Sequence, residues 1–186
     1  MDQNDAELMR RWQEGDAGAF EELVRRWQGP IGRFLSRLGS RPDHVADLCQ
    51  EVFLRLYLQG PRYQEAGVFS TWLYQIALNV ARDAARRRRC VPLPIQAFDP
   101  PALAPAVEAL YEHQELAQVM QRALADLPEQ LRLVVVLRHY ESMSFEQMAR
   151  LLKTPASTLK SRFAVALGRL RERLKQLGWS AEETTG

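Results

Sequence analysis

Apolar residues recur every three or four positions along most of the chain, the spacing that gathers side chains on one face of an α-helix. In the first half of the sequence this spacing predicts helices at residues 16–39, 44–58 and 69–88. Alternation of apolar and polar residues, which is typical of strands, is absent, and the β-branched run at 134–136 lies within helical spacing. The pattern therefore predicts an all-α protein.

Each of these three helices has a defined apolar face. The faces comprise Phe20, Leu23, Val24, Trp27, Ile31, Phe34, Leu35 and Leu38 in the first helix, Val45, Leu48, Val52 and Leu56 in the second, and Phe69, Trp72, Leu73, Ile76, Val80 and Ala84 in the third. We expect the first helix to bend at Gly29 and Pro30, because proline cannot donate a backbone hydrogen bond. Asp43 is expected to cap the second helix.

The composition changes after the third helix. Half of the ten prolines lie within residues 92–105, and the charged residues of 90–116 are all acidic. A proline-rich stretch disfavours both helix and sheet and acts as a semi-extended spacer. We therefore expect two small helical domains, at 1–89 and 117–176, joined by a flexible linker at 90–116 and followed by a tail at 177–186.

Beyond the prolines the helical spacing returns. One helix is expected near residues 106–126, and another opens at Pro128 with apolar positions Leu131, Val134, Val135 and Leu137. Residues 144–162 then predict two helices joined by a tight turn. Ser144 and Gln147 form a capping box that starts the first of them. Its apolar stripe comprises Phe145, Met148, Ala149 and Leu152.

The second helix of this pair begins with small polar and basic side chains. Thr154 is expected to cap it and Pro155 to occupy its first position, while Leu159 and Phe163 face inward. Its first turns carry Ser157, Thr158, Lys160, Ser161 and Arg162. A helix-turn-helix unit reads DNA with the N-terminal part of its second helix, although a polar helix start is also common on a merely solvated face.

The distribution of charge favours DNA binding. Residues 150–175 contain eight lysines and arginines against one glutamate, whereas the whole chain has a net charge of only +2. Positive charge concentrated in one segment is the pattern expected for contacts to phosphate groups. We therefore expect this helix-turn-helix unit to bind DNA.

The remaining composition excludes several classes of function. No stretch approaches the roughly 18 consecutive apolar residues that span a bilayer, and the acidic N-terminus does not resemble a secretory signal. We therefore expect a cytoplasmic protein without membrane insertion. Cys49 and Cys90 form no Cys-x-x-Cys pair, which favours reduced thiols, and His44, His113 and His139 lack the neighbours of a metal site. Without a nucleophile or phosphate-loop signature, we expect no enzyme, cofactor, metal or small-molecule substrate.

A polar face in the first domain has two interpretations. Asp47, Gln50, Glu51 and Arg55 lie opposite the apolar face of the helix at 44–58. Such a face is often only solvated. It can also bind a protein partner, and this functional interpretation is preferred to DNA contact because acidic groups repel phosphates.

A basic stripe on the next helix also has two interpretations. Asn79, Arg82 and Arg86 share one face, which ends in four consecutive arginines at residues 86–89. Basic residues complement the C-terminal end of a helix dipole. Four arginines exceed that need, and a side-chain amide can bind a base edge, so contact with nucleic acid is favoured.

The order of these segments resembles the bacterial RNA polymerase sigma factors of the extracytoplasmic-function (ECF) subfamily, within the sigma-70 family. Residues 46–53 resemble region 2.2, and residues 69–79 resemble regions 2.3 and 2.4. Residues 125–130 resemble the opening of region 4, and residues 144–162 resemble region 4.2. The resemblance covers about residues 16–89 and 117–176.

The resemblance implies a promoter-specificity factor without catalysis of its own. Asp47, Gln50 and Glu51 would dock on the clamp helices of core RNA polymerase, and the second domain would contact the polymerase flap. The contacts so implied to the −10 element are Arg62, Phe69, Trp72, Asn79, Arg82 and Arg86. Those implied to the −35 element are Ser157, Thr158, Lys160, Ser161 and Arg162. The linker would extend toward the RNA exit channel, and an anti-sigma factor is an implied partner.

Two segments depart from the family pattern. Residues 61–68 lack the usual aromatic-Arg-Gly run, and residues 163–168 are apolar where relatives carry histidine or arginine. We therefore expect the second domain to bind DNA weakly without polymerase. Gly168 is also expected to loosen its helix by about 1 kcal/mol relative to alanine.

Other functional classes remain open at this stage. The main alternative is a stand-alone helix-turn-helix regulator whose first domain senses a ligand and which does not act through core polymerase. Such a regulator would need a dimer surface to bind paired half-sites. A regulator that keeps the sigma fold without sigma activity, and a helical enzyme that modifies nucleic acid, are further alternatives.

Overall fold

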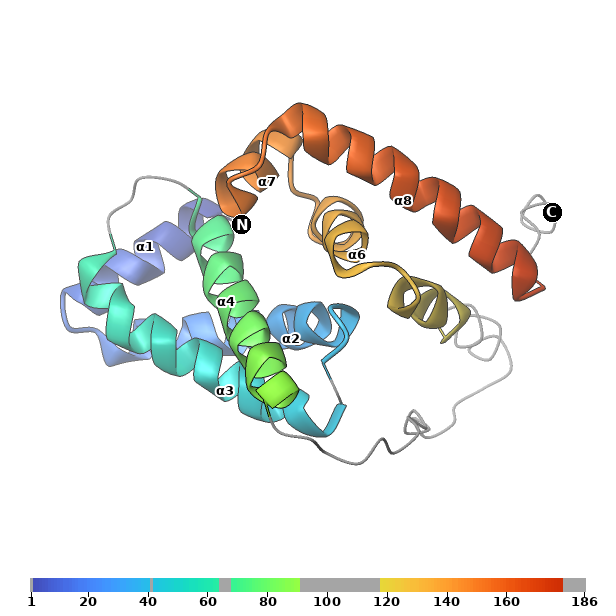
Figure 1. Cartoon of the computed structure of the whole chain (residues 1–186). Coiled ribbons are helices and arrows are strands. Elements are labelled where there is room, and N and C mark those ends of the chain that lie inside the picture. Colours follow the sequence, from blue (N-terminus) through green and yellow to red (C-terminus); the bar gives the residue numbers. More distant parts are fainter. Residues whose placement is uncertain (1, 41, 64–67, 91–117, 179–186) are drawn as a thin grey trace, which may run out of the picture. The chain divides into compact units, whose positions relative to one another are not determined.

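The computed structural model describes residues 2–40, 42–63, 68–90 and 118–178. Regular secondary structure in these ranges is helical throughout, which confirms the predicted all-α class. The chain divides into two compact units, Met1–Pro100 and Pro101–Gly186 (Figure 1). The division falls within the proline-rich segment, and each unit is described by itself.

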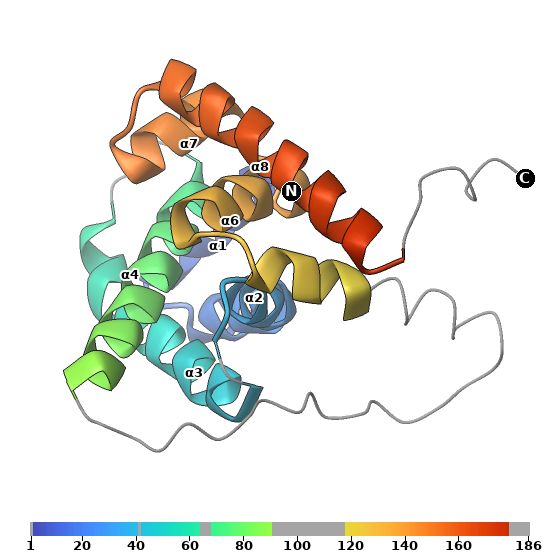
Figure 2. The same cartoon turned by 45° about the vertical axis from the view of Figure 1, so that its right-hand side comes forward.

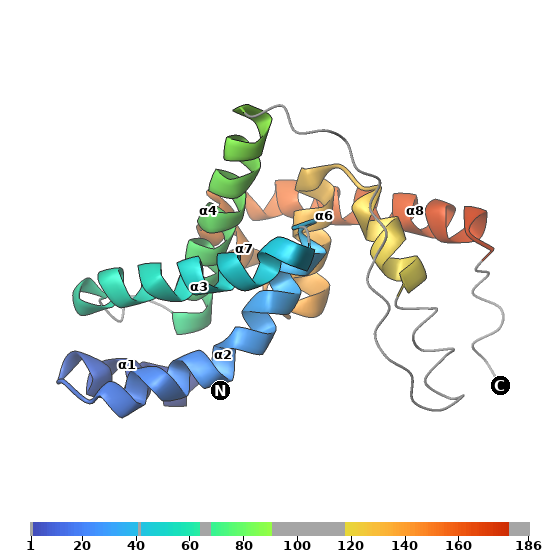
Figure 3. The ribbon, with the colours of Figure 1, turned by 90° about the horizontal axis from the view of Figure 1, so that it is seen from below.

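Unit 1 is a bundle of four helices. Its elements are α1 (Asp2–Gln13), α2 (Ala17–Arg37), α3 (Pro42–Gln59), the short 3₁₀ helix η1 (Gly60–Arg62) and α4 (Phe69–Cys90). Consecutive helices pack on one another, and α4 also contacts α2 and α1. Seen from below, α4 runs across the direction of α3 (Figure 3). The two helices meet where Asp83 of α4 contacts Arg55 of α3, and the C-terminal end of α4 extends beyond α3.

The core of unit 1 is formed by the apolar faces that the sequence predicts. Leu23, Ile31 and Phe34 of α2 are fully buried, as are Val52 and Leu56 of α3 and Leu73 and Val80 of α4. The helix α2 continues through Pro30 as one element. The predicted Asp43 cap is wrong, because α3 already begins at Pro42 and Asp43 lies in its first turn.

The N-terminal helix α1 is absent from the sequence prediction. Leu8 and Met9 are buried against the bundle, but α1 is short and only four of its twelve residues are apolar. Ion pairs along its surface compensate in part: Arg10 contacts both Glu7 and Glu14, at 2.6 Å each. Pairs at this helical spacing stabilise exposed helices by a few tenths of a kcal/mol each.

Unit 2 contains a helical segment at 118–125 and then α6 (Glu129–Val135), the π-helical turn η2 (Val136–Tyr140), α7 (Phe145–Leu152) and α8 (Ala156–Gln176) (Figure 2). Its core includes Ala123, Leu124, Leu127, Val135, Ala166 and Leu170, with Phe163 packed against them. Residues 91–117, which include most of the predicted linker and the start of the helix predicted near 106–126, lie outside the described ranges.

The helix-turn-helix unit confirms one predicted cap and corrects another. The backbone N–H of Gln147 donates to Ser144 Oγ at 3.1 Å, and that of Ser144 donates to Gln147 Oε1 at 2.7 Å, completing the capping box. Pro155 occupies the N-cap position of α8, one residue before the helix. The predicted Thr154 cap is therefore wrong; its hydroxyl donates to the carbonyl of Leu152 at 3.1 Å.

The apolar stripe of α7 is shifted from the predicted one. Met148 and Leu151 are its buried residues, while Phe145, Ala149 and Leu152 are half-buried. The left-handed backbone of Lys153 (φ 50°) ends α7 immediately after Leu152. On α8, Leu159 is fully buried, as predicted, so the polar residues before and after it face away from the core.

Candidate DNA and polymerase interfaces

The polar face of α3 is exposed and linked to α4. Asp47 and Gln50 are exposed, whereas Glu51 is half-buried. The guanidinium Nε of Arg55 donates to Glu51 at 2.7 Å, and its Nη1 donates to Asp83 of α4 at 3.0 Å. Two of the predicted docking residues are therefore presented to solvent, and the third is held by an arginine that bridges two helices.

Two leucines extend this face in a way that the sequence analysis missed. Leu54 and Leu58 are 52% and 67% exposed. They follow Asp47 by seven and eleven positions and therefore lie on the same side of α3. The sequence did contain a sign of their exposure, because neither leucine belongs to the apolar face that packs into the core. We define the docking face as Asp47, Gln50, Glu51, Leu54 and Leu58.

The basic stripe of α4 is exposed as predicted from its spacing. Asn79, Arg82 and Arg86 are all exposed, and Asn79 Oδ1 accepts a hydrogen bond from Gln75 Nε2 at 3.2 Å. Arg86 contacts Asp83 at 2.6 Å. The side chains of residues 88 and 89 lie outside the described set. The stripe thus lies beside the ion-pair network that reaches the docking face.

The aromatic residues predicted near the −10 element have different environments. Phe69 is 1% exposed and packs in the core against Trp27, with ring centroids 6.0 Å apart. Trp72 is half-buried, and its ring lies 4.5 Å from that of Tyr63. Arg62 is exposed at the end of η1. Arg62 and part of Trp72 therefore lie at the surface, while Phe69 packs against Trp72 from the core.

The predicted reading residues occupy the first two turns of α8. Ser157, Lys160 and Ser161 are exposed, and Thr158 and Arg162 are half-buried. Ser161 Oγ donates to the carbonyl of Ser157 at 3.1 Å. This segment presents hydroxyl, ammonium and guanidinium groups together, the donor set suited to phosphates and base edges.

A further basic residue lies close to these turns. Arg138 in the middle of η2 is exposed, and its guanidinium lies 5.3 Å from the centre of the Phe145 ring. Lys160 Nζ lies 5.8 Å from the same ring centre. Arg138 was not predicted, because residues 128–140 are distinguished in the sequence by their apolar spacing alone. Its proximity to Lys160 adds a second positive charge beside the start of α8.

The following turns of α8 are apolar at the surface. Val165 and Leu167 are 51% and 42% exposed. A β-carbon added at Gly168 would meet no heavy atom within 4 Å outside its own helix. The predicted interruption of the basic surface after Arg162 is therefore present in the structure.

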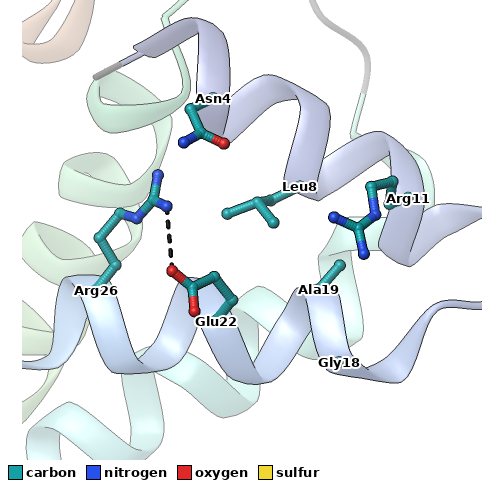
Figure 4. Close-up of a pocket in the computed structure, with 7 residues that line it drawn as sticks. All are labelled: Asn4, Leu8, Arg11, Gly18, Ala19, Glu22 and Arg26. Atoms are coloured by element: carbon teal, nitrogen blue, oxygen red, sulfur yellow. Dashed lines mark hydrogen bonds and ion pairs between the residues drawn. The ribbon is translucent and has the colours of Figure 1, made fainter.

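A cavity of about 490 Å³ lies between α1 and α2. Its lining comprises Asn4, Leu8, Arg11, Gly18, Ala19, Glu22 and Arg26 (Figure 4). Arg26 contacts Glu22 at 3.2 Å and the buried Asp5 at 2.6 Å, and Arg11 contacts Asp16. Both arginines that line the cavity are therefore paired with carboxylates. Their charges are balanced, so the cavity has no unpaired arginine for an anionic ligand.

The described residues form neither a candidate metal site nor a helix that could span a membrane. No group of three or more His, Cys, Asp or Glu side chains in these ranges could hold a metal ion. None of the described helices is both long and apolar enough to cross a bilayer. Cys49 is a half-buried free thiol, and burial raises its pKa.

Two family models match the chain, one in each unit. Residues 23–90 match sigma-70 region 2, and residues 117–170 match sigma-70 region 4. The match to region 2 begins after α1. The match to region 4 includes both helices of the helix-turn-helix unit.

Curated relatives and solved structures agree with these matches. The ECF RNA polymerase sigma-E factor of Escherichia coli K12 is 32% identical over 168 residues, covering 85% of this chain and 87% of the relative. The Haemophilus influenzae sigma-E factor is 31% identical over 185 residues, covering 93% and 96%.

Two solved structures have the same fold. CnrH in complex with the cytosolic domain of CnrY has a TM-score of 0.72 and 24% identity, with 93% of this chain and 98% of that chain covered. The sigma factor RpoE of Bartonella quintana, in complex with the anti-sigma factor NepR, has a TM-score of 0.67 and 23% identity, covering 84% and 96%. The chain belongs to the ECF sigma factors of the sigma-70 family.

Proposed function

We propose that this sigma factor directs core RNA polymerase to a specific set of promoters and assists DNA melting, with unit 1 at the −10 element and unit 2 at the −35 element. The observation that carries the proposal is that each family region presents an exposed basic face, on α4 and on the first turns of α8. The bond-forming chemistry of transcription is left to the polymerase, in the cytoplasm.

The docking face is proposed to bind the clamp helices of the polymerase. Asp47 and Gln50 supply polar contacts, and Leu54 and Leu58 supply apolar area that is exposed in the free protein. An exposed apolar group beside acidic ones suits a protein partner better than DNA. Burial of apolar surface at an interface is favourable, whereas acidic groups repel phosphates.

The −10 element is proposed to bind along η1 and α4. Arg62, Asn79, Arg82 and Arg86 contact the single strand, and Trp72 offers its ring for stacking. Unstacking a base costs a few kcal/mol, which such contacts repay. Phe69, which was predicted as a direct contact, is assigned a supporting role because it is buried.

The −35 element is proposed to bind the first turns of α8. Ser157, Thr158, Lys160, Ser161 and Arg162 enter the major groove, and Arg138 contacts the phosphate backbone nearby. The same unit is proposed to contact the polymerase flap. The complex of a related fold with the anti-sigma factor NepR supports an anti-sigma partner for this chain as well.

Transcription reconstituted on genomic DNA tests the proposal. Core polymerase with this chain is expected to start transcripts at a limited set of sites that share two sequence elements, whereas core alone is not. Replacing Asp47 and Leu54 by alanine should reduce these starts in parallel with binding to core. No discrete starts from any genomic promoter would exclude sigma activity and would favour a regulator that only keeps the fold. The stand-alone regulator is not favoured, because the chain belongs to the sigma family.

A further inference from the structure

The end of helix α1 contacts η1, the short segment that connects α3 to the proposed −10 surface. Gln13 at the end of α1 donates from Nε2 to the carbonyl of Gly60 at 2.7 Å and to the carbonyl of Tyr63 at 2.9 Å. Gly60 is the first residue of η1, and Tyr63 directly follows its last. One side-chain amide therefore fixes both ends of this segment from a helix almost fifty residues away in sequence.

The neighbouring Trp12 packs directly on the backbone of η1. A β-carbon at Gly60 would lie 1.8 Å from Trp12 Cζ3, so the contact exists only because residue 60 is glycine. The indole is held in turn by Phe20 of α2 and Tyr57 of α3, with ring centroids 4.9 and 5.6 Å away. The position of Trp12, and with it that of η1, is thus set by three helices.

The segment held in this way carries one side chain of the proposed −10 surface and is followed by a ring that packs on another. Arg62 is its last residue, and Tyr63 follows it. The Tyr63 ring packs against Trp72 of α4, and its backbone N–H donates to the carbonyl of Gly60 at 2.9 Å. A displacement of Gly60 would therefore move Arg62 and separate the Tyr63 and Trp72 rings.

We propose that Trp12 and Gln13 are positioning residues for −10 recognition. They hold η1 so that Arg62 and the paired rings of Tyr63 and Trp72 are preformed before the single strand arrives. A preformed surface avoids the ordering cost that a free segment would pay on binding. This inference rests on the proposed −10 function of unit 1, and α1 lies outside the match to region 2.

Substitutions at Gln13 can remove its hydrogen bonds to η1 while keeping the size of the side chain. Gln13→Glu keeps the length, but a carboxylate cannot donate and would face two carbonyl oxygens. Gln13→Met keeps a similar volume without a donor. Gln28→Glu is the matched control, since Gln28 is exposed on α2 and receives the same change of charge.

The test uses holoenzyme assembled from core polymerase and the full chain. The probe is a forked DNA whose non-template single strand carries six randomised positions in place of the −10 element, and bound molecules are selected and sequenced. Affinity for core polymerase and the thermal unfolding temperature are measured for each variant. These readouts report on docking and folding, whereas base preference reports on the −10 surface.

Wild type and Gln28→Glu are expected to select one −10 sequence. Gln13→Glu and Gln13→Met should bind it about fivefold to tenfold more weakly, with reduced base preference and unchanged affinity for core. Equal selection by wild type and both Gln13 variants would overturn the inference alone. A parallel loss of core binding and base preference would also overturn it, since the role would then be merely structural. No base preference in wild type would overturn the proposed −10 function and this inference with it.

Discussion

Arg55 joins the docking face of α3 to the basic stripe of α4. It contacts Glu51 on its own helix and Asp83 on α4, and Asp83 also contacts Arg86. Consecutive ion pairs therefore connect Glu51, which is proposed to bind polymerase, with Arg86, which is proposed to bind DNA. The Arg55 hydrogen bond is the main reason that the pKa of Asp83 lies below its ordinary value.

The lowered pKa of Asp83 has a consequence for acid stability. Stabilisation from a carboxyl with a lowered pKa is present above its ordinary pKa, near 4, and is lost as the pH falls through the folded-state value. Asp83→Asn should therefore unfold at lower urea than wild type at pH 7, and the difference should shrink at pH 3. Asp47→Asn controls for the loss of an exposed charge. A difference of equal size at both pH values would contradict this account.

Gly168 weakens the middle of α8 without any compensating contact. Because its missing β-carbon would meet no atom, Gly168→Ala should stabilise unit 2 by about 1 kcal/mol and raise its unfolding temperature by roughly 4–8 °C. Gly178→Ala is the control with the opposite expectation, because Gly178 has φ of +82° and alanine would be strained there. Calorimetry of the full chain checks both, and destabilisation by Gly168→Ala would show that the glycine serves packing.

At the scale of elements, the caps and the turn of the helix-turn-helix unit position the first turns of α8, which are proposed to bind DNA. Ser144 and Gln147 cap α7, Lys153 ends it in a left-handed conformation, and α8 starts after Pro155. Ser144→Ala should cost about 1 kcal/mol in the free energy of unfolding of unit 2. Thr154→Ala should cost less, since Thr154 caps no helix. Urea unfolding compares the two, and a larger loss for Thr154→Ala would restore the cap predicted from sequence.

Some of these elements could be predicted from the sequence alone, and others could not. The apolar faces of α2, α3 and α4 and the capping box were predictable, because spacing and local hydrogen bonding determine them. The helix α1 was not, since its contacts with Gly60 and Tyr63 are made far along the chain. Leu54 and Leu58 were visible as apolar residues off the buried face, but periodicity cannot separate a docking residue from a partly buried one.

At the scale of the whole molecule, the proposed function depends on two units that each offer a small basic surface. The net charge of the chain is only +2, and the apolar turns after Arg162 shorten the basic face of α8. In the proposed complex, attachment of both units to one polymerase would make the second contact intramolecular, which would raise the apparent affinity without new contacts.

The chain alone should therefore bind promoter duplex about a hundredfold more weakly than the holoenzyme does at the same salt concentration. Fluorescence anisotropy of a labelled promoter fragment, with the chain, core polymerase or both, measures this difference. Tight, sequence-specific binding by the chain without core polymerase would contradict the expectation.

The central claim is that this chain grips a promoter at two points through polymerase, and a footprint of the holoenzyme on a promoter found by reconstituted transcription tests it most directly. We predict two separate protected segments, with permanganate-reactive thymines confined to the downstream one, and loss of the upstream protection alone in Lys160→Ala combined with Arg162→Ala. A single protected palindrome formed by the chain without polymerase, and no reactive thymines with it, would contradict the account.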